Sequence, residues 1–342
     1  MNLKNLNVTT KIPKVLAIKI RHKKINQIYK KFEKSLNINE NLGVAVSGGP
    51  DSLALAFLAK IYSLKKLVKV KFFIVDHKLR KDSTKEAKIV KKILKKFNIN
   101  LEILTWKGKK PKKNIQSAAR KKRYDLMFAQ CVKYKINYLL IGHHQNDLFE
   151  NFFIRMTRGS GLKGLISLDK KKNIDEKYIL RPLIDQKKED LKFISKKVFD
   201  FYIKDPSNDD EKFHRIKMRK LINSLEKDGL NQKKFLMTIR NLKSSNSVVD
   251  FYVSENLNKN TFFYNDENKM ILNKGFFLQP HEVIFRCFSE TLKLVNKRYY
   301  FVRGKKIDKM ISDIQNNRLF RATLGGCIVE KVNQSIIVSK ER

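Results

Sequence analysis

The fold of this chain is decided by one stretch, Gly43-Val44-Ala45-Val46-Ser47-Gly48-Gly49-Pro50-Asp51-Ser52-Leu53-Ala54-Leu55-Ala56-Phe57-Leu58. Its first four residues predict a buried strand and its last six predict a helix, so the glycines lie at a strand-to-helix turn. Because glycine has no Cβ, the backbone of such a turn can approach an anion closely. The N–H groups and the positive dipole end of the new helix then face that anion. The stretch therefore predicts a phosphate-binding loop.

This loop differs from the mononucleotide P-loop, G-x-x-x-x-G-K-[ST], because no lysine follows its second glycine. A bare Ser-Gly-Gly is more often an ordinary turn than a binding site. The complete string from Ser47 to Ser52, set between a strand and a helix, is far more specific. Its two serine hydroxyls and its backbone N–H groups are available to hold a diphosphate.

Downstream of the loop, apolar strands alternate with helices. We expect strands at 68–75, 99–106 and 138–141, and helices at 83–97 and 115–135. Ser83 and Glu86 are typical of a capping box at the start of the first of these helices. Such alternation predicts an α/β fold with a doubly wound parallel sheet.

Polar residues follow the predicted strands at the points where they end. Ligands of doubly wound sheets bind beyond the carboxyl ends of the strands. Here those ends carry the phosphate loop, Asp76-His77 and His143-His144. We therefore expect three clusters from separate parts of the sequence to converge on one rim of the sheet.

The last part of the chain changes character after a turn at Asp205-Pro206-Ser207-Asn208. We expect residues 1–215 to form the catalytic domain and residues 216–342 to form a smaller helical and α+β portion. In that portion, 262–264 and 270–272 predict a hairpin, and 321–330 with 335–338 predict another strand pair. Residues 1–24 have no interpretable pattern.

The charge of the chain points to a polyanionic partner. Its 342 residues include 75 Lys and Arg against 33 Asp and Glu, a formal net charge of +42. Nucleic acid is the usual partner of such a protein. Biased codon usage can also enrich lysine, so the sign of the charge is more informative than its size.

Composition also bears on location and on metal binding. No long window is apolar enough to cross a membrane, and the first residues lack the apolar core of a secretory signal, so we expect a cytoplasmic protein.

Cys131, Cys287 and Cys327 are far apart and form no C-x-x-C pair, which indicates neither a zinc site nor a paired redox motif. We expect three reduced thiols.

The phosphate loop resembles the PP-loop, S-G-G-x-D-S, of the N-type ATP pyrophosphatases. Further blocks narrow the resemblance to the tRNA(Ile)-lysidine synthetase family, over nearly the whole chain. These blocks are, in order, Asp76-His77-x-Leu79-Arg80, Ala119-Arg120-x-x-Arg123-Tyr124, Gly142-His143-His144-x-x-Asp147-x-x-Glu150, Arg158-Gly159-Ser160-Gly161, Arg181-Pro182-Leu183, Asp205-Pro206-Ser207-Asn208 and Arg215-Ile216-Lys217-Met218-Arg219.

The resemblance implies a reaction in two steps. ATP first adenylates the C2 carbonyl oxygen of the wobble cytidine in the CAU anticodon of a tRNA(Ile), and diphosphate leaves. The ε-amino group of free L-lysine then displaces AMP and gives lysidine. ATP with Mg²⁺, tRNA(Ile) and lysine are thus the expected partners, and a homodimer is left open. The resemblance also implies that residues 216–342 bind the tRNA, since Thr323-Leu324-Gly325-Gly326 resembles the end of the family's tRNA-binding portion.

The candidate ATP-binding residues come from the loop and from two later blocks. The negative charge of Asp51 would repel phosphate, so we assign Asp51 to Mg²⁺, which binds carboxylate and phosphate oxygens together. The alternative is that Asp51 caps the helix. Arg120 and Arg123 share a helix face and can contact phosphate, unless they form only a solvated basic face. The full set is Ser47, Gly48, Gly49, Pro50, Asp51, Ser52, His77, Arg123 and His144.

The candidate catalytic residues are Asp51, Arg120, Asp147 and Glu150. The resemblance suggests that Asp147 and Glu150, three apart in a helical stretch, receive the ammonium group of lysine. Carboxylates favour a charged amine, so we expect them to position it first, and one of them or the AMP phosphate to accept the proton late. The alternative is that they form surface ion pairs with nearby arginines. His144 is expected to contact ATP or the base.

Two other functions are considered. A second tRNA-modifying enzyme with the same loop, such as a thiolase, would normally need paired cysteines to carry sulfur. A non-catalytic RNA-binding protein could retain the ATP-binding fold without its chemistry. Release of AMP that depends on tRNA and free lysine together would separate these functions.

Overall fold

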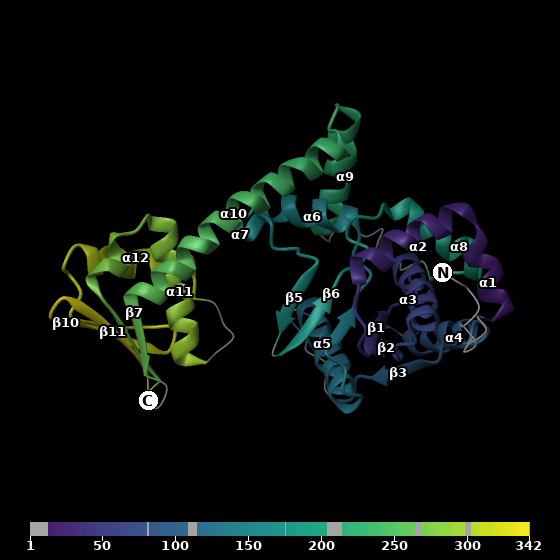
Figure 1. Ribbon diagram of the computed structural model, residues 1–342, viewed down its shortest axis with the longest axis horizontal. Coiled ribbons are helices and arrows are strands. Elements are labelled where there is room, and N and C mark those ends of the chain that lie inside the picture. The colour runs from purple at the N-terminus through teal and green to yellow at the C-terminus, as the bar shows by residue number, and fades with distance from the viewer. Residues whose placement is uncertain are drawn as a thin grey trace, which may run out of the picture. The chain divides into compact units, whose positions relative to one another are not determined.

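The computed structural model describes residues 13–80, 82–108, 115–174, 176–203, 214–264, 268–297 and 302–341. The chain forms two compact units, Met1–Leu230 and Asn231–Arg342 (Figure 1). This division falls later than the boundary expected after residue 215. Helix α9 (His214–Lys227) packs against α6 (Gln145–Met156), which explains why it belongs to the first unit. The turn at Asp205-Pro206-Ser207-Asn208 lies outside the described residues.

The first unit is built on a six-stranded sheet with the strand order β3-β2-β1-β4-β6-β5. All neighbouring strands from β3 to β6 are parallel, whereas β5 pairs antiparallel with β6. The predicted doubly wound α/β fold is confirmed, and the β5–β6 hairpin at its edge adds two strands that the sequence analysis did not assign. The strands are β1 (Leu42–Val46), β2 (Val70–Asp76), β3 (Leu101–Thr105), β4 (Tyr138–Leu140), β5 (Lys171–Ile174) and β6 (Lys177–Leu180).

Helices cover both faces of this sheet. One core joins Phe72 and Ile74 of β2 to α2, α3, α4 and α8, and a second core joins Phe73 of β2 to α5. Successive residues of β2 thus point to opposite layers, as the pleat of a strand requires. The helices are α1 (Lys14–Arg21), α2 (Lys23–Leu36), α3 (Pro50–Lys66), α4 (Ser83–Lys95), α5 (Ile115–Lys133), α6, α7 (Leu162–Leu165), α8 (Lys188–Phe199) and α9.

Strand β1 lies between β2 and β4, where the direction of winding reverses. Such a switch point leaves a crevice beyond the strand ends, which is where open α/β sheets bind ligands. The phosphate loop follows β1, and His143-His144 follows β4. Helix α3 is buried on every side from Ser52 to Ala59, so the loop stands on a rigid support.

The second unit is an antiparallel sheet covered by helices. Its strand order is β7-β8-β11-β10-β9, and α11 and α12 pack in the core under it (Figure 1). The predicted hairpin is present as β7 and β8, whereas 321–330 is not one strand but two, joined at Gly325-Gly326. The elements are α10 (Gln232–Asn260), β7 (Thr261–Tyr264), β8 (Lys269–Leu272), a 3-10 helix (Lys274–Leu278), α11 (His281–Asn296), α12 (Gly304–Gln315), β9 (Arg321–Leu324), β10 (Cys327–Val332) and β11 (Ser335–Lys340).

The three cysteines are free thiols, and each is buried. Burial raises the pKa of Cys131 and of Cys327 to about 11, so both stay protonated near neutral pH. Among the described helices, none combines the length and the apolar character needed to span a bilayer.

Candidate active site

The phosphate loop runs from the end of β1 at Val46 to the start of α3 at Pro50. Gly48 has a positive φ of 84°, a conformation that glycine adopts at little cost. Gly49 precedes Pro50 at the helix N-terminus, and no side chain caps this end. A proline in the first turn fits, because its φ is preset for a helix. The uncapped N-terminus is suited to an anion.

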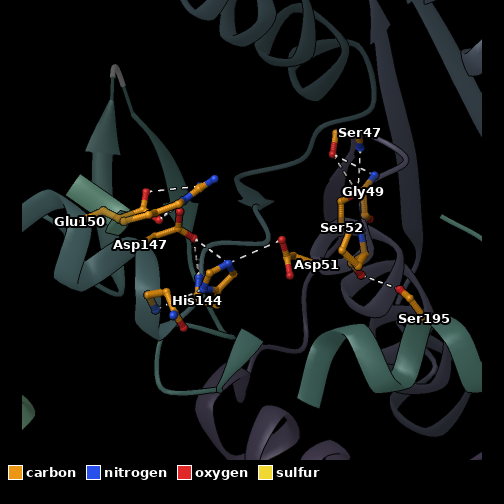
Figure 2. Close-up of polar contacts among 11 residues, drawn as sticks. Ser47, Gly49, Asp51, Ser52, His144, Asp147, Glu150 and Ser195 are labelled. Atoms are coloured by element: carbon orange, nitrogen blue, oxygen red, sulfur yellow. Dashed lines mark hydrogen bonds and ion pairs between the residues drawn. The ribbon is translucent and has the colours of Figure 1, made fainter. Parts of the chain in front are cut away.

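Hydrogen bonds inside the loop fix its shape before any ligand arrives. The hydroxyl of Ser52 accepts from the Ser47 backbone N–H at 3.0 Å and donates to the Gly49 carbonyl at 3.0 Å. The Ser47 hydroxyl donates to the Ser52 hydroxyl at 3.0 Å (Figure 2). Ser52 is buried, so its hydroxyl belongs to the loop's own framework. The backbone N–H groups in the first turn of α3 are left as the principal phosphate donors.

Two residues that the sequence analysis did not select also donate hydrogen bonds to carbonyl groups of the loop and of the first turn of α3. Ser195 of α8 is fully buried and donates to the Pro50 carbonyl at 2.6 Å (Figure 2). The backbone N–H of Ile203 donates to the Gly48 carbonyl at 2.9 Å. No local pattern marks these two residues, because each contact joins segments that are far apart in the sequence.

The Asp51 side chain points away from Ser47 and Ser52 and toward His144 (Figure 2). Its Oδ2 lies 3.6 Å from Nε2 of His144, and its Oδ1 is buried without a hydrogen-bond partner. The alternative that Asp51 caps α3 with its side chain is wrong, because no side chain caps that helix. A buried carboxylate oxygen without a partner is costly unless a cation or a donor completes it.

His144 links the loop to α6. It is the N-cap residue of that helix: its Nδ1 accepts from the Asn146 backbone N–H at 3.2 Å, and its Nε2 lies 3.5 Å from Oδ2 of Asp147. Burial alone would lower the pKa of His144, but the hydrogen bond to Asp51 and the charges of Asp147 and Asp51 raise it. The close approach depends on Gly142, where a Cβ would lie 3.1 Å from the Asp51 carbonyl oxygen.

The two carboxylates of α6 have partners of different kinds. Asp147 Oδ2 accepts from the His144 backbone N–H at 2.9 Å and closes a capping box. Glu150 is buried and accepts from Nε of Arg219 on α9 at 2.5 Å. Glu150 thus pairs with an arginine that no pattern near it predicted, rather than with Arg155 or Arg158. Burial would lower the pKa of Arg219, but Glu150 raises it through a hydrogen bond and its charge.

The remaining predicted residues lie directly after β2 and on α5. Arg123 Nε donates to His77 Nε2 at 3.2 Å, so the structure brings these two together, and the His77 ring meets Trp106 edge-on. Arg120 lies over the ring of Tyr124, with its guanidinium carbon 5.5 Å from the ring centre. Both arginines are exposed, and no interaction places Arg120 against Asp51.

Arg181 is a further buried cation at the same rim. It follows β6, donates from Nε to Nδ1 of His143 at 3.0 Å, and is held by the Asp169 carbonyl. Burial lowers the pKa of Arg181, and the neighbouring charge of Arg120 lowers it further. The rule that strand ends carry the site would have found Arg181, had β6 been recognised as a strand.

Comparison with known proteins identifies the family. A profile described as "PP-loop domain" matches residues 18–225. A protein of Orientia tsutsugamushi named tRNA(Ile)-lysidine synthase is 34% identical over 318 residues, which cover 89% of this chain and 70% of that protein. The chain belongs to the tRNA(Ile)-lysidine synthase family. A protein of the same name from Wolbachia sp. subsp. Brugia malayi is 29% identical over 310 residues, covering 89% of this chain and 71% of that one.

Among solved structures, the U34-tRNA thiolase NcsA from Methanococcus maripaludis is similar in fold, with a TM-score of 0.55. Its sequence is 19% identical, and the match covers 65% of this chain and 78% of that one. This likeness supports the fold and says nothing about the reaction.

The residues at the loop fit a magnesium ion carried by a nucleotide. Asp51 offers a buried carboxylate oxygen without a partner, beside a helix N-terminus that suits phosphate. Within the described ranges, no three acidic, histidine or cysteine side chains gather into a metal cage. Magnesium is commonly held by one or two carboxylates together with substrate phosphates, which is the arrangement available here.

Proposed function

We propose that this protein ligates free L-lysine to C2 of the wobble cytidine of a tRNA(Ile) with a CAU anticodon, through an adenylated cytidine. The observation that carries the proposal is the junction formed by Asp51, His144 and Asp147. One imidazole nitrogen lies 3.6 Å from the carboxylate of the phosphate loop and 3.5 Å from the carboxylate of α6. A nucleotide held by the loop would therefore have its reacting phosphate beside acidic residues suited to an amine.

In the first step the protein has to bind ATP and let diphosphate leave. The backbone N–H groups at the start of α3 suit the departing phosphates, and Asp51 with Mg²⁺ would neutralise the charge that develops on them. No nucleophilic side chain is needed, because holding two reactants in place can lower a barrier by roughly 7–11 kcal/mol. The family's activity requires ATP as a co-substrate, in agreement with this loop.

In the second step a lysine amine has to lose its proton. With a pKa of about 10.4, roughly one free lysine amine in a thousand is neutral near pH 7. Asp147 and Glu150 would hold the ammonium form until one of these carboxylates, or the phosphate of the departing AMP, accepts the proton. Glu150 is already paired with Arg219, so the incoming ammonium would share or displace that guanidinium. Arg219 thereby becomes a part of the lysine site in this proposal.

The RNA would approach over a surface rich in cations. Arg120 is exposed on α5, and its charge acts on Lys172 and Arg181 at the same rim. These side chains are suited to the phosphates that flank the target base. We assign Arg120 to the developing charge of the adenylation step, and His77 with Arg123 to the nucleotide.

The function is tested by the release of AMP from radiolabelled ATP. We expect release only when the tRNA(Ile) transcript and free lysine are both present, with lysidine detected by mass spectrometry of the RNA. Release driven by a sulfur donor in place of lysine would indicate a thiolase, and tRNA binding without any AMP would indicate an RNA-binding protein. Either result would refute the proposal.

The metal assignment is tested by Asp51→Ala. We expect exchange of labelled diphosphate into ATP to fall below detection, because the carboxylate that holds Mg²⁺ is gone, while tRNA binding changes by less than about twofold. Asp185→Ala is the control, since Asp185 is exposed and forms an ion pair with Lys170. Unchanged exchange in Asp51→Ala would remove Asp51 from the metal site.

The lysine site is tested by Glu150→Gln, which keeps the shape of the side chain and removes its charge. We expect the KM for lysine to rise by roughly tenfold or more, since hydrogen bonds to charged groups are worth about 1.5–3 kcal/mol. Formation of adenylated tRNA should be preserved. Glu189→Gln on the exposed side of α8 is the control. Equal loss of both steps would contradict the role given to Glu150.

A further inference from the structure

Two arginine side chains are buried among the described residues, and they differ in their partners. Arg286 of α11 is 5% exposed and forms ion pairs with Asp250 of α10 and with Glu282 of its own helix. Arg181, directly after β6, is 4% exposed, and it forms an ion pair with no carboxylate in the described part of the chain. A buried charge without a counter-charge is costly unless a ligand supplies one. Arg181 therefore indicates a site for an anion.

The guanidinium group of Arg181 is held in place by two acceptors that carry no negative charge. Its Nε donates to Nδ1 of His143 at 3.0 Å, and its Nη1 donates to the Asp169 carbonyl oxygen at 2.5 Å. A guanidinium group has five N–H donors, so three of them, on Nη1 and Nη2, make no hydrogen bond to the described residues. Two parallel N–H groups of this kind form the fork that binds a carboxylate. The position of Arg181 is thus fixed, while its charge is left for a ligand.

The strand order places Arg181 away from the phosphate loop. Strand β4 lies between β1, which leads into the loop, and β6, which leads into Arg181. Neighbouring strands are roughly 4.8 Å apart, so the ends of β1 and β6 are separated by about 10 Å. Figure 2 shows Asp147 and Glu150 on the side of His144 that is opposite to the loop. The charge of Asp147 acts on Arg181, so the anion site lies near the carboxylates assigned to the lysine amine.

We propose that Arg181 binds the α-carboxylate of the free lysine substrate, while Asp147 and Glu150 bind the ε-ammonium group that reacts. This inference rests on the proposed function, because it takes free lysine as the substrate of this site. One molecule then lies between a buried cation and a pair of carboxylates, and each of these two charged ends meets a group of opposite sign. The site selects an amino acid with a free carboxylate over an amine that lacks one.

A phosphate of the RNA fits Arg181 less well than a carboxylate does. Each phosphate of an RNA strand has a sugar on both sides, so it reaches exposed side chains more readily than a guanidinium group that is 4% exposed. Arg120 and Lys172 are exposed, and their charges lie near Arg181, so they are the cations at this rim that the RNA can reach. The carboxylate of a single amino acid is small and lies at the end of a flexible chain.

The test compares lysine with lysinamide, which keeps both amines and replaces the carboxylate by a neutral amide. Release of AMP by the full chain is measured with ATP and the tRNA(Ile) transcript, and the modified RNA is identified by mass spectrometry. The variants are Arg181→Gln and Arg181→Lys. Arg21→Gln is the control, because it removes an exposed arginine from α1 of the same unit. Circular dichroism measures folding, and exchange of labelled diphosphate into ATP measures adenylation.

We expect kcat/KM of the unaltered chain to be roughly tenfold to a hundredfold higher for lysine than for lysinamide, because the amide cannot form the charged hydrogen bonds. In Arg181→Gln the KM for lysine should rise by a similar factor, while the constants for lysinamide and the diphosphate exchange should hardly change. Arg181→Lys should keep part of the preference, since it keeps the charge without the fork. Arg21→Gln should behave like the unaltered chain.

Three results would overturn the inference. Equal use of lysine and lysinamide by the unaltered chain would mean that no cation binds the carboxylate, and this result does not depend on the folding of any variant. A preference for lysine that persists in folded Arg181→Gln would assign the carboxylate to another residue. A rise in the KM for tRNA or ATP, in place of the KM for lysine, would make Arg181 a phosphate ligand. Failure of the proposed function is distinguishable from all three, because the unaltered chain would then release no AMP with lysine.

Discussion

Asp76, at the end of β2, illustrates what single residues contribute to this site. Its side chain is 2% exposed and accepts from the hydroxyls of Ser83 at 2.8 Å and Thr84 at 2.6 Å. The predicted capping box at Ser83 is wrong, because that hydroxyl is used by Asp76, and Glu86 pairs with Arg80 instead. Asp76 thereby links the start of α4 to the end of β2, directly before His77.

The same contacts predict a dependence of stability on pH. Burial alone would raise the pKa of Asp76, but hydrogen bonds from Thr84, Ser83 and the Lys78 backbone lower it. A carboxylate whose folded pKa lies below its unfolded value, about 3.9, stabilises the fold above that pH. The contribution is lost as the pH falls through the folded pKa.

We expect Thr84→Val to lower the free energy of unfolding by about 1–3 kcal/mol at pH 7, since a buried charge loses one donor. The loss should be smaller at a pH below the unfolded value of about 3.9, because Asp76 loses its charge as the pH falls through its lowered folded pKa. Urea denaturation at the two pH values measures the difference. Thr238→Val, exposed on α10, should cost less than about 0.5 kcal/mol at either pH. If Thr84→Val lowered the free energy of unfolding equally at both pH values, the hydrogen bond to charged Asp76 would not be the cause.

At the scale of elements, the loop between β1 and α3 is shaped by neighbours as much as by its own sequence. A Cβ at Gly48 would lie 2.7 Å from Ile203 and 2.8 Å from Val90, in a backbone conformation with φ of 84°. A Cβ at Gly49 would meet nothing closer than 3.6 Å. Two adjacent glycines of one motif are therefore constrained to different degrees.

We expect Gly48→Ala to lower the free energy of unfolding by about 1–3 kcal/mol and to abolish nucleotide binding, because the backbone strain and the overlap both act on the loop. Gly49→Ala is the matched control and should keep the stability of the fold within about 1 kcal/mol. Thermal unfolding with and without ATP measures both effects. Equal stabilities of the two variants would mean that the loop adapts to a side chain at Gly48.

At the scale of the whole molecule, the net charge of +42 dominates the response to salt. Each phosphate contact releases counterions, so the affinity for tRNA should fall steeply and log-linearly between about 50 and 200 mM salt. Filter binding of the tRNA transcript over this range measures the slope. An affinity that hardly changes would mean that the basic surface does not hold the phosphates.

How far prediction reached differs between parts of the chain. The seven elements from β1 to β4 could be predicted because alternating and helical apolar periods are local signals. The short, exposed strand β5 carries no such period, and the sequence analysis assigns residues 177–180 to no strand. Arg181, which follows β6, is therefore not recognised there as a member of the site. The sequence analysis expects a single strand at 321–330. Gly325 and Gly326 both have positive φ and form a turn there, so the segment folds into two antiparallel strands.

By itself, the sequence determined the family, the α/β class and the rim on which the site is built, since a glycine turn between a strand and a helix needs only neighbours along the chain. Only the tertiary structure decided which groups act on one another: His144 between Asp51 and Asp147, Arg219 on Glu150, and Ser195 on the Pro50 carbonyl. These pairs are joined by packing between helices and strands that lie far apart in the sequence. Their distances depend on how whole elements fit together, which no local pattern encodes.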